Sequence, residues 1–391
     1  MALALSAAAC AGPGHLYGCD LDAGPCLPAP VGDAGLSGAP FVSAPVLIAT
    51  GDHHNGYTDV ARFAGAAYAA YRHASYRGYD GAAEVRVMRS PDKGATWQPA
   101  ATLSLPGYDL RDPKLTSFRD RLLVTFTAWD VKDPTQNRAF VRAALSSDGV
   151  AFTLIDPPSL PQPFGLLAWR PRAIGSDALL LPVWTADELL NHPQLDHVSL
   201  LRSSDGQTFA LAGAPPIGFG GAEPEILVQS GGRLLVTAPE QQTGATPQRQ
   251  SFCRTTAPSL GTSPFDTWDC WTAQGPRIET PLLWEWQGAV LLFGRRDLGD
   301  GRKRTAVWQV IEEEHSLLAL AELPSFGDTG APGLLPLDAN TALLTYYTSS
   351  AGDPRAVALG HEPTEVESIR LNLQADVVAV TLTLSSAPIG K

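Results

Sequence analysis

The chain lacks several features that would assign it to a common class of protein. No apolar run is long enough to cross a membrane as a helix. Basic residues are few, 28 against 40 acidic ones, and the net charge is −12. Because nucleic acids and anionic membranes bind positive surfaces, this charge predicts neither partner. A small anionic substrate is still compatible with the sequence if arginines cluster locally.

Cysteine is also scarce, and no two of the five cysteines have the C-x-x-C spacing of a zinc site. Cys19 and Cys26 are close in sequence, as are Cys253 and Cys270, so two local disulfides would leave Cys10 unpaired. Paired cysteines suit an oxidising compartment and favour export. The sequence indicates neither a metal nor a cofactor.

Residues 1–40 are rich in Ala, Gly and Pro and have no hydrophobic periodicity, which is typical of a leader followed by a tether. Cys10 follows Leu5-Ser6-Ala7-Ala8-Ala9, a run similar to the end of a bacterial lipoprotein signal. The alternatives are a lipid anchor on Cys10, an ordinary signal, and an unstructured start. We expect a monomeric exported protein, extracellular, periplasmic or lipid-anchored at the bacterial surface, in which residues 41–391 form one domain.

Glycine and proline are abundant, and a repeat recurs every 51 to 58 residues. Each copy has a polar start, a few apolar positions, a Gly or Asp turn and a strongly apolar run. The copies span 57–72, 111–130, 169–184, 222–240, 279–296 and 330–347. Five are anchored by a proline, and Asp59 stands at that place in the first: Pro113, Pro171, Pro224, Pro281, Pro332. The spacing leaves room for four strands per copy and predicts an all-β, six-bladed β-propeller of four-stranded blades.

A shorter motif alternates with this repeat at 90–97, 146–152 and 203–209. In the first copy Ser90, Asp92, Gly94 and Trp97 fit an Asp-stabilised turn with an aromatic that packs between sheets. The pattern S-x-D-x-G-x-x-W/F is the Asp box, and with it the chain resembles the sialidase (neuraminidase) superfamily over about residues 45–385. The resemblance implies a six-bladed propeller with the motif between the third and fourth strands of a blade.

Polar side chains recur at two places in each repeat, before the proline and after the second strand. Both places lie on the same face of a propeller, opposite the Asp boxes. Arginines, carboxylates and aromatics suit a carbohydrate there, particularly an acidic one, because arginine binds carboxylates in a bidentate fashion. The alternative is that Arg111–Asp112 and Arg170–Glu223 are structural ion pairs.

The resemblance to sialidases implies an arginine triad for the substrate carboxylate, a tyrosine nucleophile activated by a glutamate, and an aspartic acid/base. Tyr57-Thr58-Asp59-Val60 stands where the family has its first arginine, and residues 329–332 stand where it has its tyrosine, so the match is partial. By blade position, the candidate catalytic residues are Asp59, Asp112, Glu223 and Tyr347. The candidate substrate-binding residues are Arg72, Arg111, Trp129, Arg170, Trp184, Glu279 and Arg295.

Two functions fit these residues. The first is a sialidase-like exo-glycoside hydrolase that releases a terminal, acidic sugar from a glycan; a hydrolase of neutral sugars that uses carboxylates alone is its variant. The second is a non-catalytic cell-surface propeller that binds carbohydrate.

Overall fold

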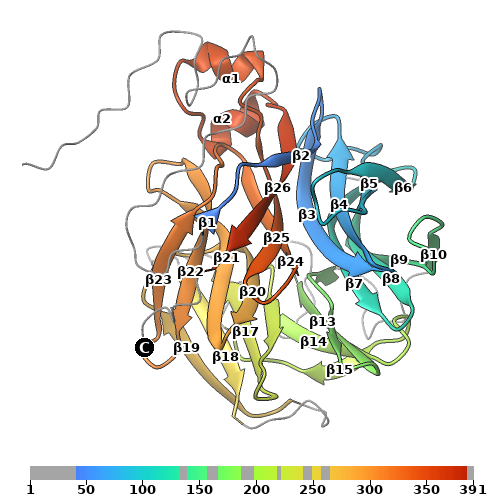
Figure 1. Ribbon diagram of the computed structural model, residues 1–391, viewed down its shortest axis with the longest axis vertical. Helices are drawn as coiled ribbons and strands as arrows, with labels where there is room; N and C mark the ends of the chain where they lie inside the picture. Colours follow the sequence, from blue (N-terminus) through green and yellow to red (C-terminus); the bar gives the residue numbers. More distant parts are fainter. Residues whose placement is uncertain are drawn as a thin grey trace, which may run out of the picture.

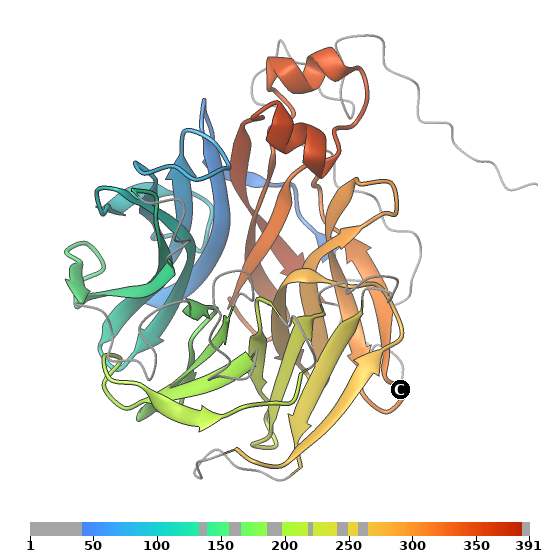
Figure 2. The same ribbon diagram turned by 180° about the vertical axis from the view of Figure 1, so that it is seen from behind.

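The computed structural model describes residues 41–132, 139–155, 166–185, 198–217, 222–240, 249–256 and 265–384. The predicted leader, with Cys10, Cys19 and Cys26, lies outside these residues. The described chain is almost entirely β-strand, and its sheets are arranged around a common centre as an all-β propeller (Figures 1 and 2). Neither helix in the described part of the chain has the length and apolar character that crossing a membrane requires.

Four separate sheets have the size of a single blade, and each is built from antiparallel strands that follow one another in the chain. The first contains β7 (Tyr108–Phe118), β8 (Arg121–Asp130), β9 (Ala139–Ser146) and β10 (Thr153–Ile155). The second contains β11 (Leu166–Ala168), β12 (Arg172–Ile174), β13 (Ala178–Thr185), β14 (Val198–Ser203) and β15 (Ala210–Gly213). The third contains β16 (Glu225–Val228), β17 (Leu234–Pro239), β18 (Gln250–Thr255) and β19 (Trp268–Ala273). The fourth contains β20 (Glu279–Trp286), β21 (Ala289–Asp297), β22 (Lys303–Ile311) and β23 (Ser316–Glu322).

The remaining strands form one nine-stranded sheet that joins the two ends of the described chain. From the N-terminal part come β1 (Phe41–Val42), β2 (Val46–Ala49), β3 (His54–Phe63), β4 (Ala66–Ala74), β5 (Glu84–Ser90) and β6 (Gln98–Leu103). From the C-terminal part come β24 (Thr329–Pro336), β25 (Thr341–Ser349) and β26 (Ala375–Thr383). Strands β1 and β2 pair with β26, and β26 meets β3 through one parallel pair, Ala375 with His54.

Each of the six repeat copies coincides with adjacent antiparallel strands, from β3–β4 to β24–β25. The six separate blades expected from the sequence are not seen, because the first and last copies belong to the same nine-stranded sheet. The repeat thus predicts the strand pairs correctly, whereas the pairing of β26 with β3 is not encoded in the repeat.

The apolar core lies between the faces of neighbouring sheets. Leu282, Phe293 and Val307 from the β20–β23 sheet pack with Tyr346 and Val378 of the nine-stranded sheet. Sheets covered on both faces need apolar residues at successive positions rather than at alternate ones. The buried runs 122–128 in β8 and 179–183 in β13 have this pattern.

Three turns between the third and fourth strands have one shared hydrogen-bond pattern. Ser90 Oγ donates to Asp92 Oδ1 at 2.8 Å and accepts from Gly94 N at 2.8 Å. The same bonds link Ser146, Asp148 and Gly149, and again Ser203, Asp205 and Gly206. Backbone hydrogen bonds, chiefly from Thr208, hold the pKa of Asp205 at about 2, so this carboxylate is a stable acceptor for its turn.

Cys253 of β18 and Cys270 of β19 are directly opposite in the sheet and form a disulfide, as one of the two predicted pairings requires. The other predicted pairing, Cys19 with Cys26, lies outside the described residues.

Two short helices, α1 (Pro354–Leu359) and α2 (Glu365–Arg370), are inserted between β25 and β26. They lie together at one end of the molecule in both views (Figures 1 and 2). The N-cap Asp353 accepts from Arg355 N, and Thr364 and Glu367 form a capping box at the start of α2.

Candidate functional site

Four inner strands have a bulge at the same place. The strand registers shift between Gly56 and Asp59 and between Arg111 and Lys114, with equivalent shifts in β20 and β24. Non-glycine residues with positive φ stand at these bulges: Tyr57 (58°), Asp112 (52°), Thr280 (51°) and Ala331 (46°). Glu223, two residues before β16, has the same positive φ (51°) at the corresponding place of its repeat copy. Thr280 and Ala331 carry no charge, so the bulge is a feature of the fold and does not require an ionisable residue. Any chemistry at a bulge depends on which side chain stands there.

This geometry shifts one alignment made from the sequence. Thr58, rather than Asp59, takes the place of the proline in the first copy, because the bulge residue before it is Tyr57. Asp59 is therefore equivalent to Lys114, one residue further along the strand.

Asp112, at the bulge of β7, and Glu223, just before β16, are both partly exposed. Burial raises the pKa of Asp112, and the charges of Lys114, Arg111 and Arg72 oppose that effect. Burial also raises the pKa of Glu223, and the negative charge of Asp112 raises it further. The charge of Asp112 therefore acts on Glu223. Thr280 N donates to Glu223 Oε2 at 2.7 Å and fixes this side chain.

Asp59 and Arg170, two other predicted site residues, are more deeply buried than Asp112 and Glu223. Arg170 Nε donates to both carboxylate oxygens of Asp59 at 3.1 and 3.2 Å, and its Nη1 donates to Glu225 at 2.6 Å. Its Nη2 donates to the carbonyl of Pro332. Arg170 thus connects three sheets as a structural ion pair, as one sequence alternative held, but its partners are Asp59 and Glu225 instead of Glu223.

Lys114 and Trp169 complete this buried layer. The ammonium of Lys114 lies 3.9 Å from the centre of the Trp169 ring, a cation–π contact. Burial, aided by the charge of Arg170, lowers the pKa of Lys114 to about 8. Trp169 Nε1 donates to the carbonyl of Pro281 at 3.0 Å, so β20 is also bound to this layer.

Arg72 and Arg111 share one carboxylate, that of Asp109. Arg72 is fully buried and donates to both Asp109 oxygens at 2.8 and 3.1 Å. Arg111 Nε donates to Asp109 Oδ2 at 2.7 Å. The ion pair that the sequence suggested between Arg111 and Asp112 is therefore replaced by one with Asp109.

Asp328 is the centre of a second charged cluster. It accepts from His54 at 3.1 Å, Arg77 at 2.7 Å, Arg295 at 3.0 Å and Tyr347 at 3.0 Å. Burial alone would raise the pKa of Asp328, but the charge of Arg77 and the hydrogen bond from His54 hold it far below its usual range.

Tyr347, a predicted catalytic residue, is fully buried in this cluster. Burial and the charge of Asp328 raise its pKa well above the ordinary value, so its hydroxyl is a donor to Asp328. A buried tyrosine in this bond has no exposed oxygen for a nucleophilic role, which separates it from the tyrosine that the sialidase resemblance implies.

Glu279 lies at the edge of the same cluster. Its carboxylate accepts from Arg295 at 2.7 Å and from Lys303 at 3.4 Å, and it pairs with Arg277. Burial would raise the pKa of Glu279, but Arg295 and Arg277 lower it to about 2. Glu279 therefore neutralises cations of the site.

The two predicted tryptophans have different environments. Trp129 is partly exposed and its ring lies 5.5 Å from that of Tyr79, which is 50% exposed. The guanidinium of Arg111 lies 4.7 Å above the Tyr79 ring. Trp184 is buried against Trp169. Trp129 is thus available to a ligand beside Asp112, whereas Trp184 supports the buried layer.

Several residues of the site were not identified from the sequence, among them Tyr57, Arg77, Asp328 and Glu365. Tyr57 directly precedes Thr58, the residue equivalent to the repeat proline. This place could have been found from the sequence if the bulge had been taken into account. Arg77 and Asp328 lie on connections outside the repeat copies, and Glu365 begins α2, so strand periodicity gives no indication of them.

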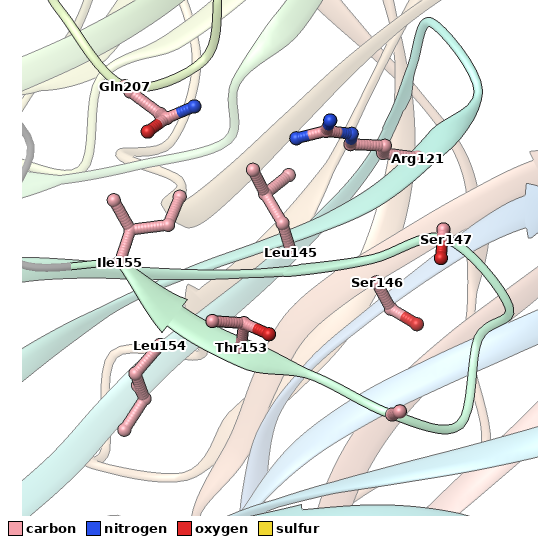
Figure 3. A pocket seen from close by; sticks show the side chains of 9 residues that line it. Arg121, Leu145, Ser146, Ser147, Thr153, Leu154, Ile155 and Gln207 are labelled. Carbon is pink, nitrogen blue, oxygen red and sulfur yellow. The ribbon is translucent and has the colours of Figure 1, made fainter.

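A hollow of about 760 Å³ lies elsewhere, beside β9 and β10 (Figure 3). Arg121, Leu145, Ile155 and Gln207 are among the residues that line it, and it contains none of the predicted site residues. It borders the Ser146 turn, so it is separate from the bulges described above.

No family model and no curated protein matches the chain. Solved structures do match its fold. A protein of unknown function from Dyadobacter fermentans superposes with a TM-score of 0.66 at 16% identity, over 89% of this chain and 100% of that one. The α-L-arabinanase of Penicillium chrysogenum complexed with arabinobiose has a TM-score of 0.57 at 13% identity, over 87% of this chain and 98% of that one.

Trypanosoma rangeli sialidase has a TM-score of 0.54 at 15% identity, over 84% of this chain and 55% of that one. The chain therefore spans about half the length of that sialidase. At such low identities the likeness concerns the fold alone. The chain has the sialidase-like propeller fold that is also found in glycoside hydrolases.

Proposed function

We propose that this protein is an exo-acting glycoside hydrolase that uses the carboxyl groups of Asp112 and Glu223. The observation that carries the proposal is a pair of partly exposed carboxyl groups that stand at corresponding places of two repeat copies, both with positive φ and both with a pKa raised by burial. Glycoside hydrolysis needs one carboxylic acid to protonate the leaving oxygen and one carboxylate to act as nucleophile or base. Burial favours the protonated form of both groups, and the negative charge of Asp112 favours it further at Glu223, so one group can serve as the acid while the other serves as the carboxylate.

The surrounding charges support an assignment of the two roles. Three cations, Lys114, Arg111 and Arg72, favour ionised Asp112. Ionised Asp112 in turn favours protonated Glu223. We therefore assign Glu223 as the acid and Asp112 as the carboxylate that assists attack. The earlier candidates Asp59 and Tyr347 are not part of this assignment, because both are buried in other contacts.

A sugar is supported by the aromatic rings beside the carboxyl groups. Tyr79 and Trp129 expose part of their rings next to Arg111, and aromatic faces stack on the apolar faces of sugar rings. The names of the structural neighbours, a sialidase and an arabinanase, agree with this class of ligand.

Several finer predictions belong to the same proposal. We count the nine-stranded sheet as two blades, β3–β6 and β24–β26 with β1 and β2, which gives six in all. The turns at Asp92, Asp148 and Asp205 are assigned as Asp boxes. Export, a lipid on Cys10, a monomeric state, and one domain over residues 41–391 remain predictions.

The test is a screen of fluorogenic glycosides, neutral and acidic, with the wild type and the variants Asp112→Asn and Glu223→Gln. Each variant should lower kcat/KM by about 10²- to 10⁴-fold, the usual contribution of acid–base catalysis. Asp338→Asn is the control, since Asp338 lies in the exposed turn at the far end of the β24–β25 hairpin.

Full activity in both variants would exclude these residues from catalysis. Saturable sugar binding without turnover in the wild type would favour the non-catalytic carbohydrate-binding propeller instead.

A further inference from the structure

The arginines expected to bind an acidic substrate are already paired within the chain. Arg72 and Arg111 bind Asp109, and Arg170 binds Asp59 and Glu225. Arg295 binds Glu279 and Asp328. All four predicted arginines thus have internal carboxylate partners, and a substrate carboxylate would have to displace one of them.

Glu365 at the start of α2 is the partner that comes from outside the propeller strands. Its Oε1 lies 3.0 Å from Arg295 Nη1 and 3.3 Å from Arg77 Nη2, and its Oε2 lies 3.5 Å from Lys303 Nζ. One carboxylate is therefore held by cations from the β4–β5 connection, β21 and β22. Its side chain is 18% exposed, so it lies at the surface of the cluster, above the fully buried Asp328.

The cluster is next to the proposed site. Arg295 acts electrostatically on Glu223, and the carbonyl of Arg77 accepts a hydrogen bond from Arg111 Nη2 at 3.2 Å. A sugar that reaches Asp112 and Glu223 is therefore near Glu365 as well.

The chain holds Glu365 in this place through contacts that do not involve the arginines. Its backbone N donates to the carbonyl of Gly301 at 3.0 Å. Glu362, three residues earlier, pairs with Arg304 on β22 at 2.7 Å. The capping box of Thr364 and Glu367 fixes the first turn of α2. Glu365 is thus a positioned group rather than a freely rotating one.

We infer that Glu365 determines specificity: its carboxylate occupies the Arg77–Arg295 pair, so that the site takes a neutral sugar and rejects an acidic one. This inference rests on the proposed glycoside hydrolase function. A substrate carboxylate at this place would meet the negative charges of Glu365, Glu279 and Asp328 with no arginine left to neutralise it. A neutral sugar needs no such neutralisation. The acidic-sugar prediction made from the sequence did not include this carboxylate.

The experiment uses acetate, the smallest carboxylate, so that the result does not depend on which sugar ring the site prefers. The full chain is titrated with sodium acetate at constant ionic strength, and the Nε–Hε signals of Arg77 and Arg295 are followed by NMR. In Glu365→Gln these signals should shift saturably, with binding about tenfold or more tighter than in the wild type, because two charge-assisted bonds become available.

Two variants serve as controls. Glu362→Gln removes a charge from the same segment but leaves the Arg77–Arg295 pair occupied, so it should behave as the wild type. Glu365→Asp keeps the negative charge and should also bind acetate no more tightly than the wild type does. In parallel, the wild type is assayed with a matched glucoside and glucuronide and with a sialoside.

The outcomes separate this inference from the proposed function. Acetate binding to the wild type as tight as to Glu365→Gln, or no gain in Glu365→Gln, overturns the inference. Hydrolysis of the sialoside or the glucuronide by the wild type also overturns it and leaves the hydrolase proposal standing. A gain of acetate binding in Glu365→Gln without hydrolysis of any glycoside supports the role of Glu365 and rejects the hydrolase. If Glu365→Gln does not fold, the wild-type assays still decide: hydrolysis of the glucoside but not of the glucuronide or the sialoside supports the inference, and hydrolysis of either acidic glycoside overturns it.

Discussion

Four carboxyl groups in the site form two pairs that affect stability in opposite directions. Glu279 and Asp328 lie among cations and have lowered pKa values, so their charged forms stabilise the fold. Asp112 and Glu223 have pKa values raised by burial, so their charged forms destabilise it. Groups that lower stability are retained where chemistry requires them, which is the reason that raised pKa values mark candidate sites.

Asp112→Asn should stabilise the protein at neutral pH by about 1 kcal/mol, the usual scale of a single substitution, because burial penalises the charged form of Asp112. The folded state binds a proton on Asp112 more tightly than the unfolded chain does, so stability falls as pH rises from about 4 through the raised pKa. Asparagine removes this loss and tolerates the positive φ at this bulge. Urea denaturation between pH 4 and pH 8 measures the difference, which should shrink toward pH 4.

Glu279→Gln is the matched control and should have the opposite sign. Its pKa of about 2 means that the charged form stabilises the fold above about pH 4.5, and that this contribution is lost as pH falls toward 2. The variant should lose about 2 kcal/mol at neutral pH and less in acid. A destabilised Asp112→Asn would contradict the assignment of Asp112 as a desolvated carboxyl group.

The sequence identified Asp112, Glu223 and Arg295 by their places in the repeat, and the structure brings them into one region. It could not identify their partners. Asp109 is two residues before Arg111 in the same strand, but Asp328 and Glu365 lie in connections whose positions depend on packing rather than on strand periodicity.

At the scale of elements, the disulfide joins β18 to β19, the outer strands of their sheet. The cysteines are 17 residues apart, so the bridge closes a short loop in the unfolded chain. The double variant Cys253→Ala/Cys270→Ala should lose about 3 kcal/mol of stability, measured by urea denaturation.

Reductant isolates the contribution of this bridge. It should lower the denaturation midpoint of the wild type and leave that of the double variant unchanged. Equal midpoints for the oxidised wild type and the double variant would mean that the bridge adds nothing to stability.

Strand pairs were predictable because apolar runs flanked by turns recur in each repeat. Helices α1 and α2 were not predicted, although Thr364 and Glu367 have the spacing of a capping box. With six residues each, the helices are too short to give a periodic apolar pattern.

At the scale of the whole molecule, the first and last repeat copies make a close contact. A Cβ on Gly333 of β24 would lie 2.6 Å from the Cα of Asp59 and 2.6 Å from the N of Val60. These are backbone atoms, so they do not move aside as a flexible side chain would. The approach of β24 to β3 therefore requires glycine at this position.

Gly333→Ala should destabilise the protein by about 2 kcal/mol or more, because the added methyl overpacks this contact. Gly231→Ala is the control, since a Cβ there would meet no atom within 4 Å. Thermal and urea denaturation of both variants measure the difference. Similar stability of the two variants would show that β24 and β3 separate readily.

The repeat predicted that distant segments converge on a centre, and they do. It did not predict how many sheets are separate, because that depends on the meeting of β26 with β3 at the ends of the described chain. A repeated pattern specifies the strands of each repeat copy and their packing against neighbouring copies. How the propeller closes depends on the first and last copies, which share one sheet.

The buried layer of Arg170 and Trp169 has a consequence for how a sugar chain could be accommodated. Arg170 donates to Asp59 of β3 and to the carbonyl of Pro332 in β24, and Trp169 donates to the carbonyl of Pro281 in β20. Both side chains are buried, so they fill space between these strands that a ligand would need in order to pass. Under the proposed hydrolase function, a glycan would approach Asp112 and Glu223 from their exposed side and would not thread between the strands that this layer joins.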